Sequence, residues 1–275
     1  GAVRDAIYKF ALAEREAELA DRQVDNVRSL EADVARRVRA GEVAALERDQ
    51  ARSELFDAQA IARAQQAQVA VTRTALLSLT GLSAPPQSFE EPLAPEQDTG
   101  RHPRLQAEAR NIDAAEAAFR LVETATRDSP EIGVFVGSNR DTFGTQYDTT
   151  VGLRIRLPFS TEARNAPRRA AAVAEVTAAQ AEYAAAEREL RVELATAQQE
   201  LAAAESQAPL VAGRLQAVRS ALTRLQGSYD AGEIGLIEVL RARIALFDAE
   251  VAQVRNHLAI GQARATVNQA LGVIP

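Results

Sequence analysis

Ala40-Gly41-Glu42-Val43 and Ala231-Gly232-Glu233-Ile234 are two versions of one stretch, and this stretch decides the fold. They lie 191 positions apart, and the same offset aligns Leu55-Phe56-Asp57-Ala58 with Leu246-Phe247-Asp248-Ala249. It also aligns Leu79-Thr80-Gly81-Leu82 with Ala270-Leu271-Gly272-Val273. A period this long is not that of a solenoid, whose repeats run to about 20–50 residues. The chain is therefore interpreted as two copies of one plan.

Each copy predicts a long helical hairpin. Apolar residues before the second Ala-Gly-Glu stretch recur at alternating spacings of four and three, the a/d pattern of a coiled coil: Leu190, Leu194, Ala197, Leu201, Ala204, Ala208, Val211, Leu215, Val218, Leu222, Leu225 and Tyr229. The first copy has the same pattern from Val3 to Val38, interrupted at Glu31. Because glycine ends helices readily, we expect reversals at Gly41 and Gly232. The expected hairpins pair 2–40 with 42–80 and 163–230 with 233–271.

Composition supports long helices and excludes several function classes. The chain has 4% aromatic residues and only 10 Pro in 275 residues. Its net charge is -6, with the two signs mixed along the chain, so we expect no nucleic-acid partner. It contains no Cys or Met and only two His residues, His102 and His257, outside any ligand-spaced cluster. No nucleophile or phosphate-binding motif is present. We therefore expect no enzyme activity, no cofactor and no metal site.

The segment from Pro130 to Phe159 interrupts the helical pattern with period-two alternation. Ile132, Val134 and Val136 alternate with small residues or Phe135, and Val151, Leu153 and Ile155 alternate with residues that include Arg154 and Arg156. This predicts two strands around a polar loop, each about the length that a tilted strand needs to cross a bilayer. Two interpretations stay open: a membrane barrel strand pair with Arg154 and Arg156 facing the lumen, or a soluble hairpin packed on the helices.

These residues together resemble the TolC-like outer membrane factors, also called outer membrane efflux proteins. The resemblance rests on the duplicated helical hairpins, the strand pair ending in Leu157-Pro158-Phe159, and the tip stretch Ser228-Tyr229-Asp230-Ala231-Gly232. The stretch Gly232 to Glu238 with Leu240-Arg241-Ala242-Arg243, and the pair His102-Pro103, are similar to the CzcC branch, which is linked to heavy-metal export.

The resemblance implies a homotrimer with a twelve-stranded barrel in the cell outer membrane and a large periplasmic helical tunnel. Its implied partners are outer membrane lipid, a periplasmic adaptor (membrane fusion protein) and an inner-membrane pump of the resistance-nodulation-division (RND) type. Gly1 aligns with Val192 under the offset, so the first copy lacks counterparts of about residues 105–191. We therefore expect the chain to be the C-terminal part of a longer protein.

The expected fold class is mainly α, with two antiparallel coiled-coil hairpins in an internal repeat and one β-hairpin. The expected segments are a first hairpin at 1–82, a Pro-rich linker at 83–104, a helix at 105–129, the strand pair at 130–159 and a second hairpin at 160–275. A periplasmic coiled-coil scaffold or adaptor without a channel is the alternative function.

The resemblance also implies a gate at the tip of the second hairpin. Tyr229 and Glu238 match a tyrosine and an acidic residue of the family's tip, whereas Ile234 and Arg241 depart from the family pattern. Asp230 and Glu233 make the tip acidic, and Arg241 is placed to pair with Glu238 at i,i+3. Tyr229 has two interpretations, as a gate residue or as the last layer of the heptad stripe. His102 is expected to start a helix before Pro103.

Overall fold

The computed structural model describes residues 1–86, 89–95, 99–124, 130–140, 142–144, 146, 148–157, 159 and 162–273. Parts of the predicted linker, of the predicted helix at 105–129 and of the hairpin loop therefore lie outside the described residues. The chain divides into two compact units, one of Gly1–Gln97 with Arg191–Pro275 and one of Asp98–Leu190.

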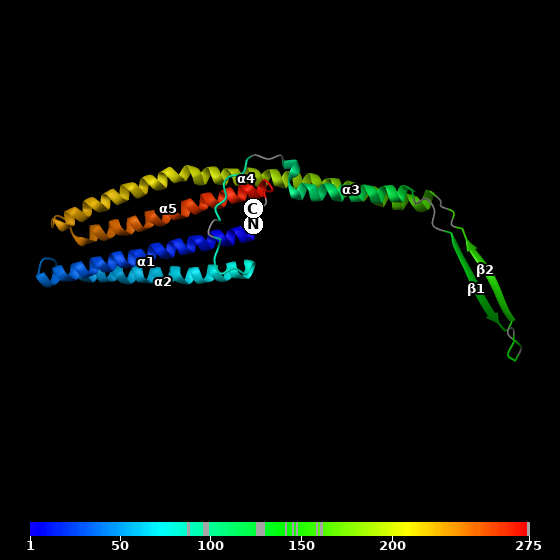
Figure 1. The fold of residues 1–275 in the computed structure, drawn as a ribbon, viewed down its shortest axis with the longest axis horizontal. Helices are drawn as coiled ribbons and strands as arrows, with labels where there is room; N and C mark the ends of the chain where they lie inside the picture. Colours follow the sequence, from blue (N-terminus) through cyan, green and yellow to red (C-terminus); the bar gives the residue numbers. More distant parts are fainter. Residues whose placement is uncertain are drawn as a thin grey trace. The chain divides into compact units, whose positions relative to one another are not determined.

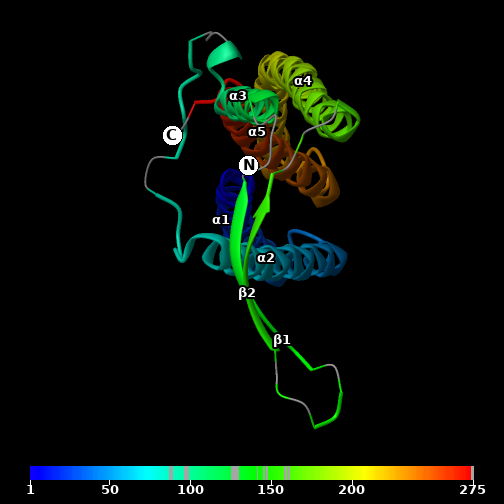
Figure 2. The same ribbon diagram turned by 90° about the vertical axis from the view of Figure 1, so that its right-hand side faces the viewer.

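The first unit contains both helical hairpins, which confirms the mainly α prediction. Helix α1 (Ala2–Ala40) is followed by α2 (Ala45–Thr80), and the C-terminal part of α4 (Glu162–Asp230) is followed by α5 (Leu236–Ala270). Figures 1 and 2 show that α1 lies between α2 and α5, while α5 lies between α1 and α4. The core of this unit therefore consists of several apolar clusters between neighbouring helices.

Corresponding glycines end corresponding helices in the two copies. Gly41 and Gly232 have φ of 78° and 77°, and Gly81 and Gly272 have φ of 72° and 76°. After Gly41 the amide of Glu42 donates to the carbonyl of Arg37, and after Gly232 the amide of Glu233 donates to the carbonyl of Ser228. This bonding pattern satisfies the last carbonyls of a helix and requires the left-handed conformation that glycine adopts easily.

The return helices begin later than predicted, at Ala45 and Leu236 instead of positions 42 and 233. The left-handed glycine ends one helix but does not start the next. The chain still needs an extended residue before the new first turn, and Ala44 and Gly235 supply it with ψ of 148° and 162°. The helix start is delayed in the same way in both copies, since Ala44 and Gly235 are again 191 positions apart.

The predicted heptad stripe of the second copy forms the seam of α4. Of its twelve positions, Leu190, Ala197, Leu201, Leu215 and Tyr229 are buried and the other seven are half-buried. In α1 the predicted seam is also buried or half-buried from Ala6 to Val38, whereas Val3 is exposed. The period of the sequence therefore identified the correct helix face.

The second unit contains α3 (Pro103–Thr124), the N-terminal part of α4 and the strand pair. A short 3-10 helix, η1 (Thr99–Arg101), precedes α3, and Leu105 of α3 packs with Ala186 and Leu190 of α4. Strands β1 (Glu131–Asn139) and β2 (Asp148–Arg156) pair in an antiparallel register. In this register Ile132, Val134 and Val136 lie opposite Ile155, Leu153 and Val151, so the two predicted apolar stripes share one face of the hairpin.

Candidate functional site

The tips of the two helical hairpins meet in one apolar cluster. Leu30, Val34 and Ala51 of the first hairpin pack with residues of the second: Tyr229, Leu236, Val239 and Leu240. All seven are at most 5% exposed. Because the cluster draws on both hairpins, any separation of the tips would expose apolar surface to water.

Tyr229 joins this cluster to a polar contact between the hairpins. Its side chain is 3% exposed, and its hydroxyl donates to Oε2 of Glu47 at 3.1 Å. The guanidinium carbon of Arg37 lies 5.1 Å from the centre of the Tyr229 ring. Burial, and then the hydrogen bond to Glu47, raises the pKa of Tyr229 to about 12. The phenol therefore stays protonated and donates at physiological pH.

Arg37 forms the second contact between the tips. Its Nη2 donates to Oδ1 of Asp230 at 3.0 Å, and its Nε lies 3.0 Å from Oδ2 of Asp33. The hydrogen bond to Asp230 raises the pKa of Arg37. One guanidinium thus contacts two carboxylates and one aromatic ring. We call Asp33, Arg37, Glu47, Tyr229 and Asp230 the tip cluster.

Further polar contacts join α1 to α5 along their length. Nη1 of Arg243 in α5 donates to the carbonyl of Asn26 in α1 at 3.4 Å, and its Nη2 donates to Oε1 of Gln226 in α4 at 3.2 Å. Burial lowers the pKa of Arg243, and its Nε is buried without a partner among the described residues. Farther along, Nε of Arg255 donates to Oε1 of Glu16 at 2.5 Å, and Glu16 is itself buried. The two hairpins are therefore joined by arginines at several levels.

The remaining predicted tip residues lie on the exposed side of the turn. Glu238 accepts from Nη1 of Arg241 at 3.2 Å, which confirms the predicted i,i+3 pair. Glu233 is exposed. The structure thus brings Tyr229 and Asp230 together with residues of the first hairpin, and it leaves Glu238 and Arg241 paired with each other.

Sequence reasoning missed Arg37 and Glu47. A signal for Glu47 was present, because Glu47 stands 191 positions before Glu238 and is its counterpart in the first copy. Arg37 has Ser228 as its counterpart, so the repeat gives no hint of it.

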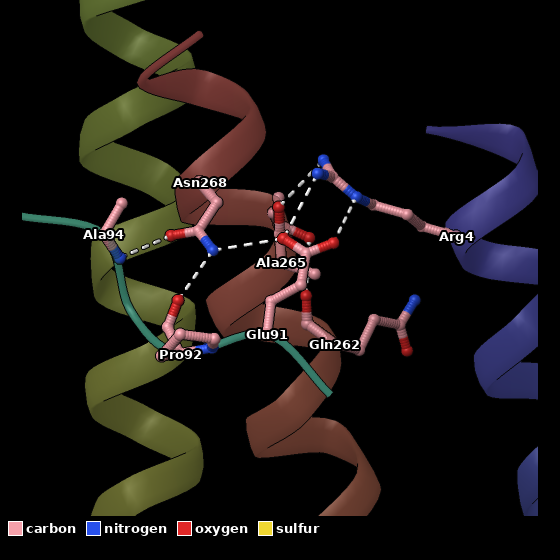
Figure 3. A network of polar contacts seen from close by, with 8 residues as sticks. Arg4, Glu91, Pro92, Ala94, Gln262, Ala265 and Asn268 are labelled. Atoms are coloured by element: carbon pink, nitrogen blue, oxygen red, sulfur yellow. Dashed lines mark hydrogen bonds and ion pairs between the residues drawn. The ribbon is translucent and has the colours of Figure 1, made fainter. Parts of the chain in front are cut away.

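A second polar site fastens the linker to the helices (Figure 3). Asn268 of α5 is 2% exposed and uses both ends of its amide. Its Oδ1 accepts from the amide of Ala94 at 2.8 Å, and its Nδ2 donates to the carbonyl of Pro92 at 2.9 Å and to Oε2 of Glu91 at 3.1 Å. Glu91 also accepts from Nε and Nη2 of Arg4 at 3.0 and 3.2 Å. We call Arg4, Glu91 and Asn268 the linker clasp.

The two histidines have ordinary surface roles. Nδ1 of His102 accepts from the amide of Arg104 at 3.1 Å, which caps α3 and confirms that His102 helps to start a helix. Nε2 of His257 lies 3.2 Å from Glu90, and its side chain is exposed. Among the described residues, no group of three or more His, Cys, Asp or Glu side chains is arranged to hold a metal ion.

The second face of the strand pair carries Arg154 and Arg156. Arg156 lies opposite Glu131, with 3.5 Å between Nη1 and Oε2. The guanidinium carbon of Arg154 lies 5.3 Å from the centre of the Phe135 ring. The first face is apolar and exposed: the side chains at 132, 134, 136, 151, 153 and 155 are 63–74% exposed. In the helical part of the chain that the structure describes, no helix combines the length and apolar character needed to cross a bilayer.

Comparison with known proteins identifies the family. The family model described as outer membrane efflux protein matches residues 94–273, more than half of the chain. No sequence among curated proteins matches significantly.

Several solved structures share the fold. A membrane protein from Pseudomonas aeruginosa is 20% identical with a TM-score of 0.75, over 98% of this chain and 65% of its own. CusC is 19% identical with a TM-score of 0.77, over 97% of this chain and 66% of its own. The CmeC outer membrane channel of Campylobacter jejuni is 15% identical with a TM-score of 0.74, over 99% of this chain and 62% of its own. The chain thus spans less than two thirds of the length of these structures, and at these identities the likeness concerns the fold. The chain belongs to the outer membrane efflux protein family.

Proposed function

We propose that this chain forms part of a homotrimeric outer membrane channel, a passive conduit of a tripartite efflux system. In this proposal the channel works with a periplasmic adaptor and an inner-membrane RND pump, and it carries heavy-metal cations or drugs out of the periplasm. Family membership supports an efflux role. The alternative, a periplasmic scaffold without a channel, predicts that the strand pair is a soluble hairpin surrounded by water and protein instead of lipid.

The observation that carries the proposal is the two-faced strand pair. Each strand has nine residues, which meets the length of about 9–11 residues that a tilted strand needs to cross a bilayer. Its apolar face is exposed, although a large apolar patch on a soluble protein is unfavourable. Lipid would cover this face, and the face with Arg154 and Arg156 would then point to water.

Cysteine labelling tests this arrangement directly, because the chain has no native Cys. Single Cys residues at positions 151, 153 and 155 should resist a membrane-impermeant maleimide in outer membranes, while Cys at 154 and 156 should react. Leu153 is 73% exposed in the protomer, so protection at this position requires an external cover. After solubilisation in denaturant all five positions should react. Equal reactivity of all five in intact membranes would favour the soluble scaffold.

The tip supplies the proposed gate. We infer that the tip cluster holds the two hairpins together in a closed state, so that Tyr229 keeps the end narrow, while the exposed Glu238 favours cations. Two contacts support this role, the Tyr229–Glu47 hydrogen bond and the Arg37–Asp230 pair. Rings of like charge around a constriction set ion preference in channels generally.

Planar bilayer recordings of the channel test the gate. Tyr229→Ala should raise the conductance, and Glu238→Gln should lower the permeability ratio of cations to anions. Glu175→Gln, an equal charge change at an exposed position of α4, serves as the matched control. If both tip variants behave like the control, these residues act only in packing and at the surface.

A further inference from the structure

The second face of the strand pair holds a compact stack of three residues. Phe135 of β1 lies directly opposite Gly152 of β2. A Cβ atom built on Gly152 would lie 2.5 Å from Cζ and 2.6 Å from Cε1 of Phe135, so the ring covers the space above this glycine. Phe135 is consequently 43% exposed, less than the side chains of the opposite face. A side chain at position 152 would displace the ring from this place.

Arg154 completes the stack, since its guanidinium carbon lies 5.3 Å from the centre of the Phe135 ring. A guanidinium at this distance from an aromatic face is attracted by the ring, which restricts an otherwise flexible side chain. Directly across the ladder from Arg154 stands Gly133, which offers no side chain and has open space around its Cα. Arg154 is thus held by the ring and faces no carboxylate across the ladder.

Arg156, two residues further along, is paired with an opposite charge. It faces Glu131 across the ladder, so the net charge of the two side chains is zero. The other acidic residue on this face is Asp148, at the opposite end of β2. It lies six residues from Arg154, or about 20 Å along an extended strand, farther than a Debye length at physiological salt. The net charge of this part of the face is therefore the single positive charge of Arg154.

We propose that Arg154, positioned by Phe135 above Gly152, is a selectivity-determining residue that attracts anions and anionic groups on the water-facing side of the strand pair. The inference rests on the proposed channel function. Arg154 would favour anions, whereas Glu238 at the tip is proposed to favour cations. Symmetry would repeat the charge in every protomer, and several like charges around one water-filled passage act on every ion that enters it.

The test is the reversal potential of the reconstituted channel under a potassium chloride gradient. Arg154→Gln should raise the potassium-to-chloride permeability ratio by about twofold or more, while Glu238→Gln should lower it. The double variant Glu131→Gln with Arg156→Gln removes two charges of opposite sign and should leave the ratio unchanged. Arg154→Lys keeps the charge and should retain most of the wild-type ratio, which separates loss of charge from damage to the fold.

Phe135→Leu tests the positioning step, because it keeps an apolar side chain but removes the ring face. It should move the ratio in the same direction as Arg154→Gln, by a smaller amount. A conducting channel with an unchanged ratio in Arg154→Gln would overturn the inference while leaving the channel function intact. An unchanged ratio in Phe135→Leu alone would overturn the role of the stack. A wild-type protein that forms no channel would overturn the proposed function and this inference with it.

Discussion

Tyr229→Phe removes a single atom from the contact between the two hairpin tips. The ring remains in the apolar cluster with Leu30 and Leu236, while the donor to Glu47 is lost. The substitution therefore isolates the hydrogen bond from the packing. Tyr229→Ala, in contrast, removes the hydrogen bond, the buried ring and the surface over which Arg37 lies.

The expected size of the effect follows from burial. A hydrogen bond to a charged group contributes about 1.5–3 kcal/mol to stability. Glu47 is half-buried, so water can replace the lost donor, and we expect a loss near the lower limit, about 1.5 kcal/mol. Truncation of a buried aromatic ring costs about 3–5 kcal/mol, which sets the expectation for Tyr229→Ala.

Native-state hydrogen exchange measures these losses where they occur. A loss of about 1.4 kcal/mol corresponds to a tenfold change in an equilibrium constant. Amides in peptides covering residues 30–50 and 225–240 should therefore exchange about tenfold faster in Tyr229→Phe. Glu233→Gln, at an exposed position of the same turn, is the matched control and should leave the exchange unchanged.

A double-mutant cycle with Glu47→Gln completes the test. If the hydroxyl acts through Glu47, the two substitutions together should cost less than the sum of their separate effects. Unchanged exchange in Tyr229→Phe, or strictly additive effects in the cycle, would refute the reasoning and leave Tyr229 as a packing residue.

Four further predictions concern stability and charge. Asn268→Ala removes a buried side-chain amide that bonds to the Ala94 amide and the Pro92 carbonyl of the linker, and it should lower the free energy of unfolding by about 1–3 kcal/mol. Asn111→Ala, at an exposed hydrogen bond, should change the free energy of unfolding by less than about 0.5 kcal/mol in the same denaturant titration. The raised pKa of Tyr229 means that the folded state holds the phenol proton more tightly than the unfolded state, so this stabilisation is present below about pH 10 and is lost as the pH rises to about 12. Denaturation curves across this range should show that the free energy of unfolding falls by about 2 kcal/mol, and the fall should be smaller in Tyr229→Phe. Gly232→Ala forces alanine to φ near 77° and should cost about 1–2 kcal/mol, whereas Gly213→Ala, in open space within α4, should stabilise the protein by up to about 1 kcal/mol, as thermal unfolding can measure. Arg241→Gln should leave unfolding unchanged, because exposed pairs contribute little, but it frees Glu238 and should raise the cation permeability ratio in bilayers.

The sequence predicted the hairpins well because their determinants are local. Heptad spacing identifies the face of a helix that meets its neighbour in the next segment, and a left-handed glycine marks the end of each helix. The alternation in β1 and β2 likewise identified the apolar face that their register confirms.

The second contact face of α1 and α5 could not be predicted in the same way. Tyr8 and Ala11 of α1 pack against Leu258 and Ala265 of α5, outside the predicted stripe of α1. A helix packed on two sides shows apolar residues over a wide arc, and one heptad stripe then accounts for only part of its burial. The linker clasp was missed for a related reason. Asn268 meets Glu91 only after the fold brings them together from positions 177 residues apart.

The tip shows how a duplicated sequence becomes asymmetric. Glu47 and Glu238 occupy the same place in the two copies, two residues into the helix that follows each turn. At the end of the preceding helix, however, the first copy has Val38 where the second has Tyr229, so only one phenol is available between the two carboxylates. Glu47 accepts the hydrogen bond from this phenol, because Tyr229 is buried against the first hairpin. Glu238 instead pairs with Arg241, whose counterpart in the first copy is the uncharged Gln50. Two substitutions thus assign one carboxylate to holding the hairpins together and leave the other on the exposed side of the turn.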